Sequence, residues 1–320
     1  MIEKIKIESR DHWLSLRQQD VTASAIGCLL GVHEYQSALG LFALKTGRIK
    51  EDVETTPPMQ RGLLLEPVAL KLLQQQRPDW QITWNGRGGE LDGHYYRDSE
   101  HRIGATPDCF AIDERGRKGA LQIKTVDRFT FKKKWFSDND VEGADGELMP
   151  PLWAAVQVLV EAHLTGAEWA AVAPLVIGSG LDQHIIEVPI HAGVIERVQK
   201  CVADFWRRVA ENDPPDADYG RDGKIVAQLY GEENGLEIDL SRDNRIPAIC
   251  DRREELLAIR LAANKELDEI KCELRDKLGP HSSGYAQGWR ITNKLQHRSG
   301  YTVEPKDIRS LRTKRIGGRN

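Results

Sequence analysis

Hydrophobic residues in the first half of the chain alternate between helical and strand-like spacing. Residues 22–48 form two apolar stretches separated at Gly31, which predicts two short helices, and the Pro57–Pro58 pair closes this region. A helical period follows in residues 63–76 and ends before Pro78. Strand-like spacing is then found in residues 81–86, 90–98, 101–113 and 119–126. The last two segments flank a charged turn, so they predict a β-hairpin.

The second half begins with an apolar helix over residues 152–165, which lies between a proline pair and Gly166. Two further strands are predicted at residues 170–179 and 183–190, before an amphipathic helix at 192–212. This mixture of helices and strands predicts an α/β fold.

The Pro214–Pro215 pair predicts a domain boundary, with one domain over residues 1–220 and a C-terminal α+β appendage over residues 221–320. The appendage is expected to contain a long charged helix at 251–278 with only a narrow apolar seam. A strand follows, in which Trp289, Ile291 and Leu295 alternate with Arg290, Thr292 and Lys294. One face of this strand is therefore expected to pack and the other to be basic.

Charge is distributed unevenly along the 320 residues. The whole chain has 45 Lys and Arg against 49 Asp and Glu, a formal charge of −4. Residues 297–320 carry a net charge of +5, so the remainder is at −9. The basic residues of this tail are Arg298, Lys306, Arg309, Arg312, Lys314, Arg315 and Arg319. A basic tail suits a polyanion such as DNA, because binding releases counterions, although a solvated tail explains the charge equally well.

Composition also indicates in which cellular compartment the protein is expected. No apolar run approaches the ~18–20 residues of a membrane-spanning helix, and the first residues lack the apolar core of a signal peptide. The five cysteines are widely spaced and show no CxxC pair, which indicates free thiols rather than disulfides or a zinc site. We therefore expect a cytoplasmic protein with no membrane partner.

The predicted hairpin carries the residues with the clearest chemical meaning. It brings Asp108 at the start of one strand close to Gln122 and Lys124 on the other, and residues two apart on a strand share a face. Carboxylate oxygens bind Mg²⁺, which can activate water and neutralise charge on a phosphate, and a nearby lysine can assist. The backbone carbonyl of Ile123 is a further candidate ligand. The spacing thus predicts metal-assisted phosphodiester hydrolysis.

Four segments together resemble a known family. The hairpin matches the Pro-Asp…Asp/Glu-x-Lys motif of the PD-(D/E)xK nucleases, a fold with a mixed central sheet flanked by helices. Residues 13–24 resemble the Trp-x-x-Leu-Arg…Thr-Ala-Ser opening of the phage lambda exonuclease (YqaJ) branch. Residues 62–66 match its Gly-x-x-x-Glu helix, and Gln157 matches the Gln of a later helix. Order and spacing agree over roughly residues 10–210.

This resemblance implies a 5′→3′ exonuclease that digests one strand of a double-stranded DNA end. It implies two Mg²⁺ ions (Mn²⁺ or Ca²⁺ can substitute in binding), a ring-shaped homotrimer, and a phage-type single-strand annealing protein as partner. The source would be bacterial or phage-encoded. By position, Asp108 is a metal ligand, Lys124 the catalytic lysine, Glu66 a metal-associated acid and Gln157 part of the active-site rim. Arg17, Ser24 and Thr106 match positions that hold the 5′-phosphate, and Met59 falls near an apolar wedge that parts the strands.

Position 122 departs from the family pattern, because Gln stands where the family has Glu or Asp. A carboxamide offers one neutral oxygen and an NH₂ group in place of two anionic oxygens. The second metal ion is therefore expected to bind poorly. We expect an impaired or engineered inactive form, with natural divergence as the alternative.

Several candidate residues also have a structural explanation. Asp108 can be a turn residue, Lys124 a solvated strand lysine and Arg17 a surface residue. Glu66 can be an acid in the first turn of a helix, and Gln157 a buried side chain with a structural partner. Residues 129–136 mix lysines with aromatic residues, which suits either a DNA backbone or a solvated loop.

Two other functions are compatible with the sequence. An endonuclease of the same superfamily would cut closed circles and would have no 5′-phosphate pocket. A non-catalytic DNA-end-binding protein would have Gln122 as its native residue. Restoring Glu at position 122 separates the enzymatic reading from the non-catalytic one.

Overall fold

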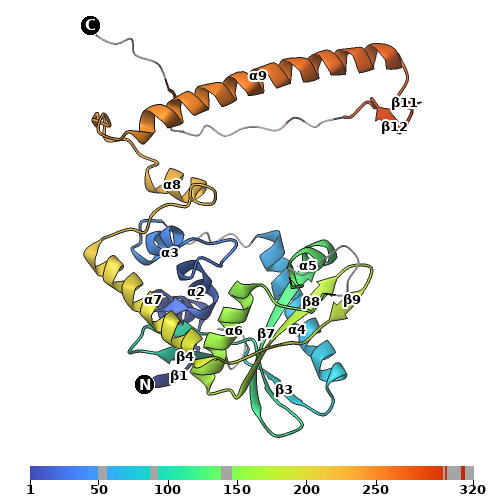
Figure 1. Cartoon of the computed structure of the whole chain (residues 1–320). Helices are drawn as coiled ribbons and strands as arrows, with labels where there is room; N and C mark the ends of the chain where they lie inside the picture. Colours follow the sequence, from blue (N-terminus) through green and yellow to red (C-terminus); the bar gives the residue numbers. More distant parts are fainter. Residues whose placement is uncertain (50–55, 87–92, 138–145, 298–299, 301–310, 314–320) are drawn as a thin grey trace. The chain divides into compact units, whose positions relative to one another are not determined.

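The computed structural model describes residues 1–49, 56–86, 93–137, 146–297, 300 and 311–313. The chain divides into two compact units, Met1–Leu229 and Tyr230–Asn320 (Figure 1). Helix α8 (Gly223–Leu229) lies in the first unit, beyond the boundary expected at residue 220. It contacts α3 (Ala38–Lys45), and Arg221 Nη1 donates to the carbonyl of His33 at 2.6 Å.

The first unit is built on a mixed sheet with the strand order β10-β8-β7-β6-β3, in which β9 also pairs with β8. Its strands are β3 (Gln81–Trp84), β6 (Cys109–Ile112), β7 (Lys118–Asp127), β8 (Trp169–Ile177), β9 (Leu181–Gln183) and β10 (Ile186–Val188). Strands β7 and β8 are parallel and the other pairs are antiparallel. The predicted hairpin is confirmed as β6–β7, and the expected α/β architecture with a mixed sheet is confirmed as well.

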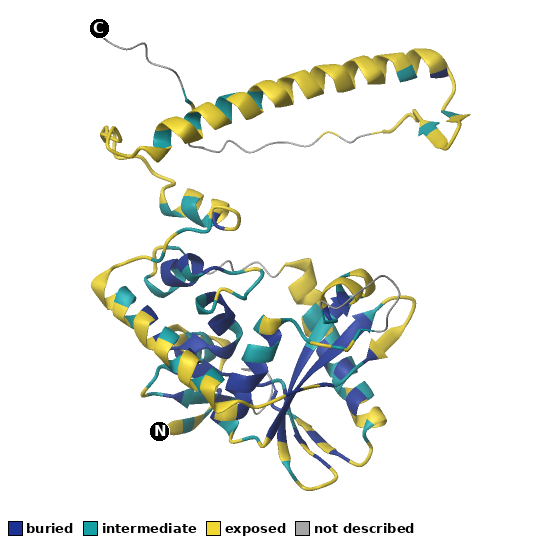
Figure 2. Ribbon diagram, in the orientation of Figure 1, coloured by how far each residue is buried: buried dark blue, intermediate teal, exposed yellow. Residues whose placement is uncertain are grey.

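One helix covers each face of this sheet. Helix α6 (Leu152–Thr165) packs on the face that carries Ala120 and Val126, whereas α4 (Pro57–Gln76) packs on the face of Leu121 and Ile123. This division follows from the alternation of side chains along β7. Both faces of the sheet are buried, as the dark blue strands of Figure 2 show.

A smaller sheet of order β1-β4-β5-β2 stands beside the first one. It consists of β1 (Ile2–Lys6), β2 (Val21–Thr22), β4 (His94–Asp98) and β5 (Ile103–Ala105), and it is accompanied by α1 (Arg10–Gln19), α2 (Ala23–Leu29), α3 and α7 (Ala192–Glu211). A buried polar cluster holds it to α1, because Asp20 accepts from Tyr95 Oη at 3.1 Å and from Arg97 Nε at 3.0 Å.

Two expectations about the first unit need correction. The single strand expected at residues 101–113 is two strands, β5 and β6, which belong to different sheets. Pro107 lies in the break, since it has no N–H to continue a ladder. The helix expected to begin at residue 63 begins at Pro57, and the Pro57–Pro58 pair occupies its first turn, where a missing N–H costs nothing.

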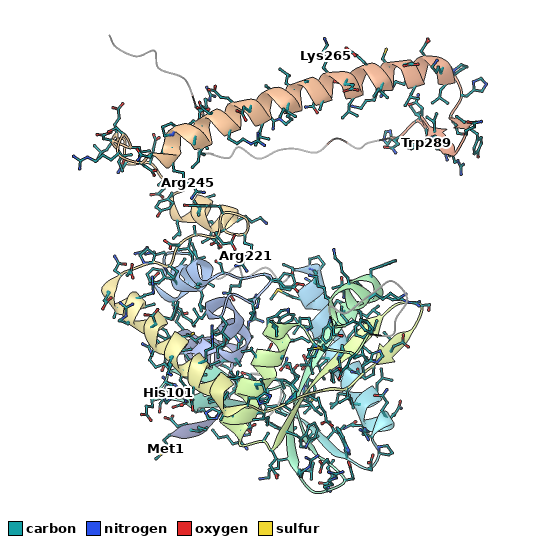
Figure 3. The ribbon with its side chains drawn as sticks, viewed as in Figure 1. Met1, His101, Arg221, Arg245, Lys265 and Trp289 are labelled. Atoms are coloured by element: carbon teal, nitrogen blue, oxygen red, sulfur yellow. The ribbon has the colours of Figure 1, made fainter. Side chains whose placement is uncertain are left out.

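The second unit contains α9 (Arg245–Leu278) and a hairpin of β11 (Ser283–Ala286) and β12 (Trp289–Thr292). The long helix is confirmed and begins six residues earlier than expected. The prediction that one face of this strand packs is wrong, because Trp289 is 75% exposed (labelled in Figure 3) and Leu295 is fully exposed. A two-stranded hairpin has no second layer on which to bury them. Of the basic tail only Arg312 is described, and its other six basic residues lie outside the described residues.

Within the described ranges, no helix combines the length and the apolar character needed to cross a membrane.

Gly104 on β5 provides a test of the small sheet. A Cβ atom at this position would lie 1.8 Å from Tyr95 Oη, so Gly104→Ala must displace the buried tyrosine that bonds Asp20. We expect a loss of about 2–4 kcal/mol in the free energy of unfolding, from overpacking and a broken buried hydrogen bond. Urea denaturation measures it, with Gly180→Ala as the control because nothing lies within 4 Å of its added Cβ. Equal stability of both variants would contradict this packing of Tyr95 against Gly104.

Candidate active site

Asp108 occupies the point where strand β6 begins. The β6–β7 ladder ends at Cys109 opposite Leu121, so within the described part of the chain no strand pairs with the next residues of β7 on that side. The Asp108 carboxylate takes this place: its Oδ2 accepts from the backbone N–H of Ile123 at 2.9 Å and from Gln122 Nε2 at 2.6 Å. Because N–H and C=O of one strand residue point to the same side, the carbonyl of Ile123 also faces this gap. These two hydrogen bonds fix the Asp108 side chain, so the explanation of Asp108 as a simple turn residue does not account for it.

A chain of hydrogen bonds leads from β7 to helix α6. Lys124 Nζ donates to Gln157 Oε1 at 2.9 Å, and Gln157 Nε2 donates to Glu161 Oε1 at 2.9 Å. Lys124 Nζ also lies 5.3 Å from the centre of the Trp153 ring. Lys124 is half-buried, so it is not a solvated strand lysine. Gln157 links Lys124 to an acid that was not among the residues predicted from the sequence.

Glu161 is that acid. The residue is 1% exposed, and its Oε2 has no hydrogen-bond partner within the described part of the chain. Burial raises the pKa of this carboxyl, and the nearby charge of Asp108 raises the pKa further, whereas Gln157 and Lys124 act in the opposite direction. Its signal in the sequence was a single acid in the apolar run of α6, one helical turn after Gln157.

Glu66 approaches from the opposite face of the sheet. It is buried in the interior of α4, nine residues after Pro57, so the first-turn explanation is wrong. Its Oε1 accepts from Trp84 Nε1 at 2.9 Å. Burial raises the pKa of the Cys109 thiol, and the charges of Asp108, Glu66 and Glu161 add to this effect. Three carboxyl groups thus converge around the start of β6.

The residues at this point fit a divalent cation. Gln122 is 4% exposed, and its Oε1 has no hydrogen-bond partner among the described residues. Leaving such a buried oxygen unsatisfied costs free energy, so an electropositive partner is expected. Asp108 and the Ile123 carbonyl supply further oxygens of the kind that Mg²⁺ prefers.

A second acidic group lies elsewhere in the first unit. Asp98, Glu100 and His101 have ligand atoms within 4.8 Å of one another, the one such group of three among the described His, Cys, Asp and Glu residues. His101 Nδ1 lies 2.7 Å from Asp98 Oδ2, and the amino group of Met1 is 3.9 Å from Asp98 Oδ1. Figure 3 labels Met1 and His101 in this region. These mutual contacts explain the group without an ion.

The residues predicted to hold a phosphate partly assemble. Trp13 Nε1 donates to Thr106 Oγ1 at 2.9 Å, and the guanidinium of Arg17 stacks 4.5 Å from the centre of the Trp13 ring. Arg17 is half-buried and is therefore not an ordinary surface arginine. Ser24 Oγ lies 3.1 Å from Thr22 Oγ1, at the same edge of the small sheet, where β2 runs parallel to β5.

Met59 stands apart from these residues. It lies in the first turn of α4 with 58% of its surface exposed, about 10 Å along the helix from Glu66. The lysines of residues 129–136 are exposed on the short helix α5 (Arg128–Lys134), where Lys134 pairs with Glu34. Phe131 and Trp135 of the same segment are buried, so they belong to the core.

Comparison with known protein families finds one similarity. Residues 12–168 match the model of the YqaJ-like viral recombinase domain, a span that includes every predicted site residue. This segment of the chain is therefore similar to a YqaJ-like viral recombinase domain. No curated protein matches the chain.

Several solved structures resemble the chain. An alkaline exonuclease from Laribacter hongkongensis (LHK-Exo) is 19% identical with a TM-score of 0.43, covering 68% of this chain and 99% of that one. A phage-related exonuclease from Haemophilus somnus 129PT is 14% identical with a TM-score of 0.40, covering 60% and 94%. A SOX–DNA complex is 12% identical with a TM-score of 0.40, covering 66% and 70%.

Gln157 allows a test of the hydrogen-bond chain. Gln157→Met removes the donor to Glu161 and the acceptor for Lys124 in a buried setting. We expect the free energy of unfolding to fall by about 1–3 kcal/mol. Chemical denaturation measures this change, and Gln228→Met on exposed α8 serves as the control, with an expected change of less than about 0.5 kcal/mol. Unchanged stability in Gln157→Met would mean that both partners bond elsewhere.

Proposed function

We propose that the chain is an Mg²⁺-dependent 5′→3′ exonuclease that digests one strand of linear double-stranded DNA. The observation that carries this proposal is the convergence of Asp108, Gln122 and Lys124 at the open side of β7, within a segment similar to a YqaJ-like viral recombinase domain. The digestion would expose single strands for annealing by a phage-type partner protein. The five free cysteines fit the reducing cytoplasm of a bacterial host.

Each residue has a role in phosphodiester hydrolysis. Asp108, the Ile123 carbonyl and Gln122 Oε1 would hold the divalent cation, which supplies an acidified water and neutralises charge on the phosphate. Lys124 would stabilise the charge that develops on the phosphate, and Gln157 holds the lysine in position through its 2.9 Å hydrogen bond. Glu66 would bind water or a second ion from the α4 side. No covalent intermediate is required.

Recognition of a DNA end distinguishes an exonuclease from an endonuclease. We assign this role to Arg17, Ser24 and Thr106, because a guanidinium and two hydroxyl groups are suitable donors to a terminal phosphate. The stacking of Arg17 on Trp13, which itself bonds Thr106, supports a preorganised pocket. Met59, exposed at the start of α4, would part the two strands.

The C-terminal unit would hold the DNA during digestion. Within it, Arg245, Arg252, Arg253 and Arg260 line one shallow groove of α9 together with Ile249 and Leu256. A row of guanidinium groups suits a phosphate backbone. We retain the division into a nuclease domain and a DNA-holding appendage, with α8 joined to the former. The proposed assembly is the ring-shaped homotrimer expected for this family.

The role of position 122 can be tested directly. A carboxamide gives the cation less charge than a carboxylate, so we expect Gln122→Glu to raise Mg²⁺ affinity and the cleavage rate by at least about tenfold. The assay compares linear and closed circular duplex DNA with the unchanged chain and Gln122→Glu, and Lys124→Met in the Gln122→Glu background is the inactive control. Cleavage of circles would favour an endonuclease. Absence of cleavage in both forms, with DNA ends still bound, would favour the non-catalytic function.

End recognition is tested through Arg17. We expect Arg17→Ala to weaken the preference for 5′-phosphorylated ends by more than about tenfold, since a charge-assisted bond to phosphate contributes ~1.5–3 kcal/mol. Digestion rates of 5′-phosphate and 5′-hydroxyl substrates measure the preference. Arg10→Ala, at the exposed start of α1, is the control. An unchanged preference in Arg17→Ala would remove this residue from the pocket.

A further inference from the structure

Two buried oxygen atoms without partners lie in the same part of the first unit. They are Gln122 Oε1 on β7 and Glu161 Oε2 on α6, from residues that are 4% and 1% exposed. Neither has a hydrogen-bond partner among the described residues, although Glu161 Oε1 and Gln122 Nε2 are both bonded. Each unsatisfied buried acceptor costs free energy, and either a cation or a proton on the Glu161 carboxyl would satisfy the two oxygens.

The topology places Gln122 and Glu161 at the same height along the axes of β7 and α6. Helix α6 ends at Thr165, β8 begins at Trp169, and Trp169 pairs with Gly119 at the start of β7. Helix α6 therefore runs antiparallel to β7.

The step from Gln157 to Glu161 covers about 6 Å of helix, and the step from Lys124 back to Gln122 covers about 6.6 Å of strand. Since Gln157 bonds Lys124, Glu161 lies opposite Gln122. The packing of Ala120 with Val158 and Ala162 in one cluster agrees with this register.

We propose that Glu161 is a ligand of the divalent cation and replaces the carboxylate that Gln122 does not provide. With Asp108 it restores two anionic ligands to the site, so the charge of the ligand set matches that of the cation. The acid has moved from the strand to the facing helix, whereas Gln122 contributes a neutral oxygen. This inference rests on the proposed function only in requiring that the site holds a cation.

The experiment measures metal binding without DNA. Calorimetric titration of the full chain with Mn²⁺ should give a site that is weakened at least about tenfold in Glu161→Gln, because losing a ligand costs more than losing an outer-shell contact. Glu196→Gln on the exposed side of α7 should bind as the unchanged chain does. The double variant Gln122→Glu/Glu161→Gln should recover the lost affinity, since it moves the carboxylate back to the strand.

Three results would overturn the proposal: no Mn²⁺ binding by the unchanged chain, equal binding in Glu161→Gln, or a loss that Gln122→Glu does not restore. The last result would mean that Glu161 acts only by holding Gln157. Thermal unfolding in a chelator checks that each variant is folded.

A second measurement needs no variant. Fe²⁺ bound at the site, treated with ascorbate and peroxide, should cut the backbone near both Asp108 and Glu161. Cuts near Asp108 without cuts near Glu161 would also overturn the proposal. Binding that depends on Glu161 in a chain that does not cleave DNA would support the ligand role and reject the nuclease function instead.

Discussion

The site depends on one unfinished strand pairing. Strand β6 begins at Cys109, so among the residues that the structure describes no strand pairs with the backbone of β7 beyond Leu121 on that side. A side chain completes the pairing in place of a backbone, because the Asp108 carboxylate accepts the N–H of Ile123. The break at Pro107 makes this possible, since it ends β5 in one sheet and starts β6 in another. The same break fixes Thr106 beside Trp13 and Asp108 beside Gln122.

The apolar surroundings of this gap strengthen the electrostatic interactions between its few polar groups. Helix α6 and helix α4 bury opposite faces of β7, and most of the residues that they contribute are aliphatic. In such a setting charges interact over longer distances than at the surface, which is why Asp108, Glu66 and Glu161 all influence Cys109. A ligand entering this region would meet groups that are already oriented.

The sequence predicted the local part of this arrangement well. The hairpin, the Gln-bearing helix and the motif residues Asp108 and Lys124 are close in sequence or carry clear periodic signals. Contacts between distant segments were harder to predict. The bond from Trp13 to Thr106 spans 93 residues, and the partnership of Gln157 with Glu161 depends on which face of α6 meets the sheet. The expected packing of Trp289 failed because alternation alone does not say whether a second layer exists.

The buried and the exposed cysteines differ in chemical reactivity. Burial raises the pKa of the Cys28 thiol to about 12 and raises that of Cys109 as well, so neither forms the thiolate that alkylating reagents require. Cys272, in contrast, is exposed on α9. A maleimide dye would therefore react with the C-terminal unit while leaving the thiol beside the three carboxyl groups untouched. Cys272 thus offers a site for a fluorescent label on the long helix without any added cysteine, with the half-buried Cys201 and Cys250 as slower competitors.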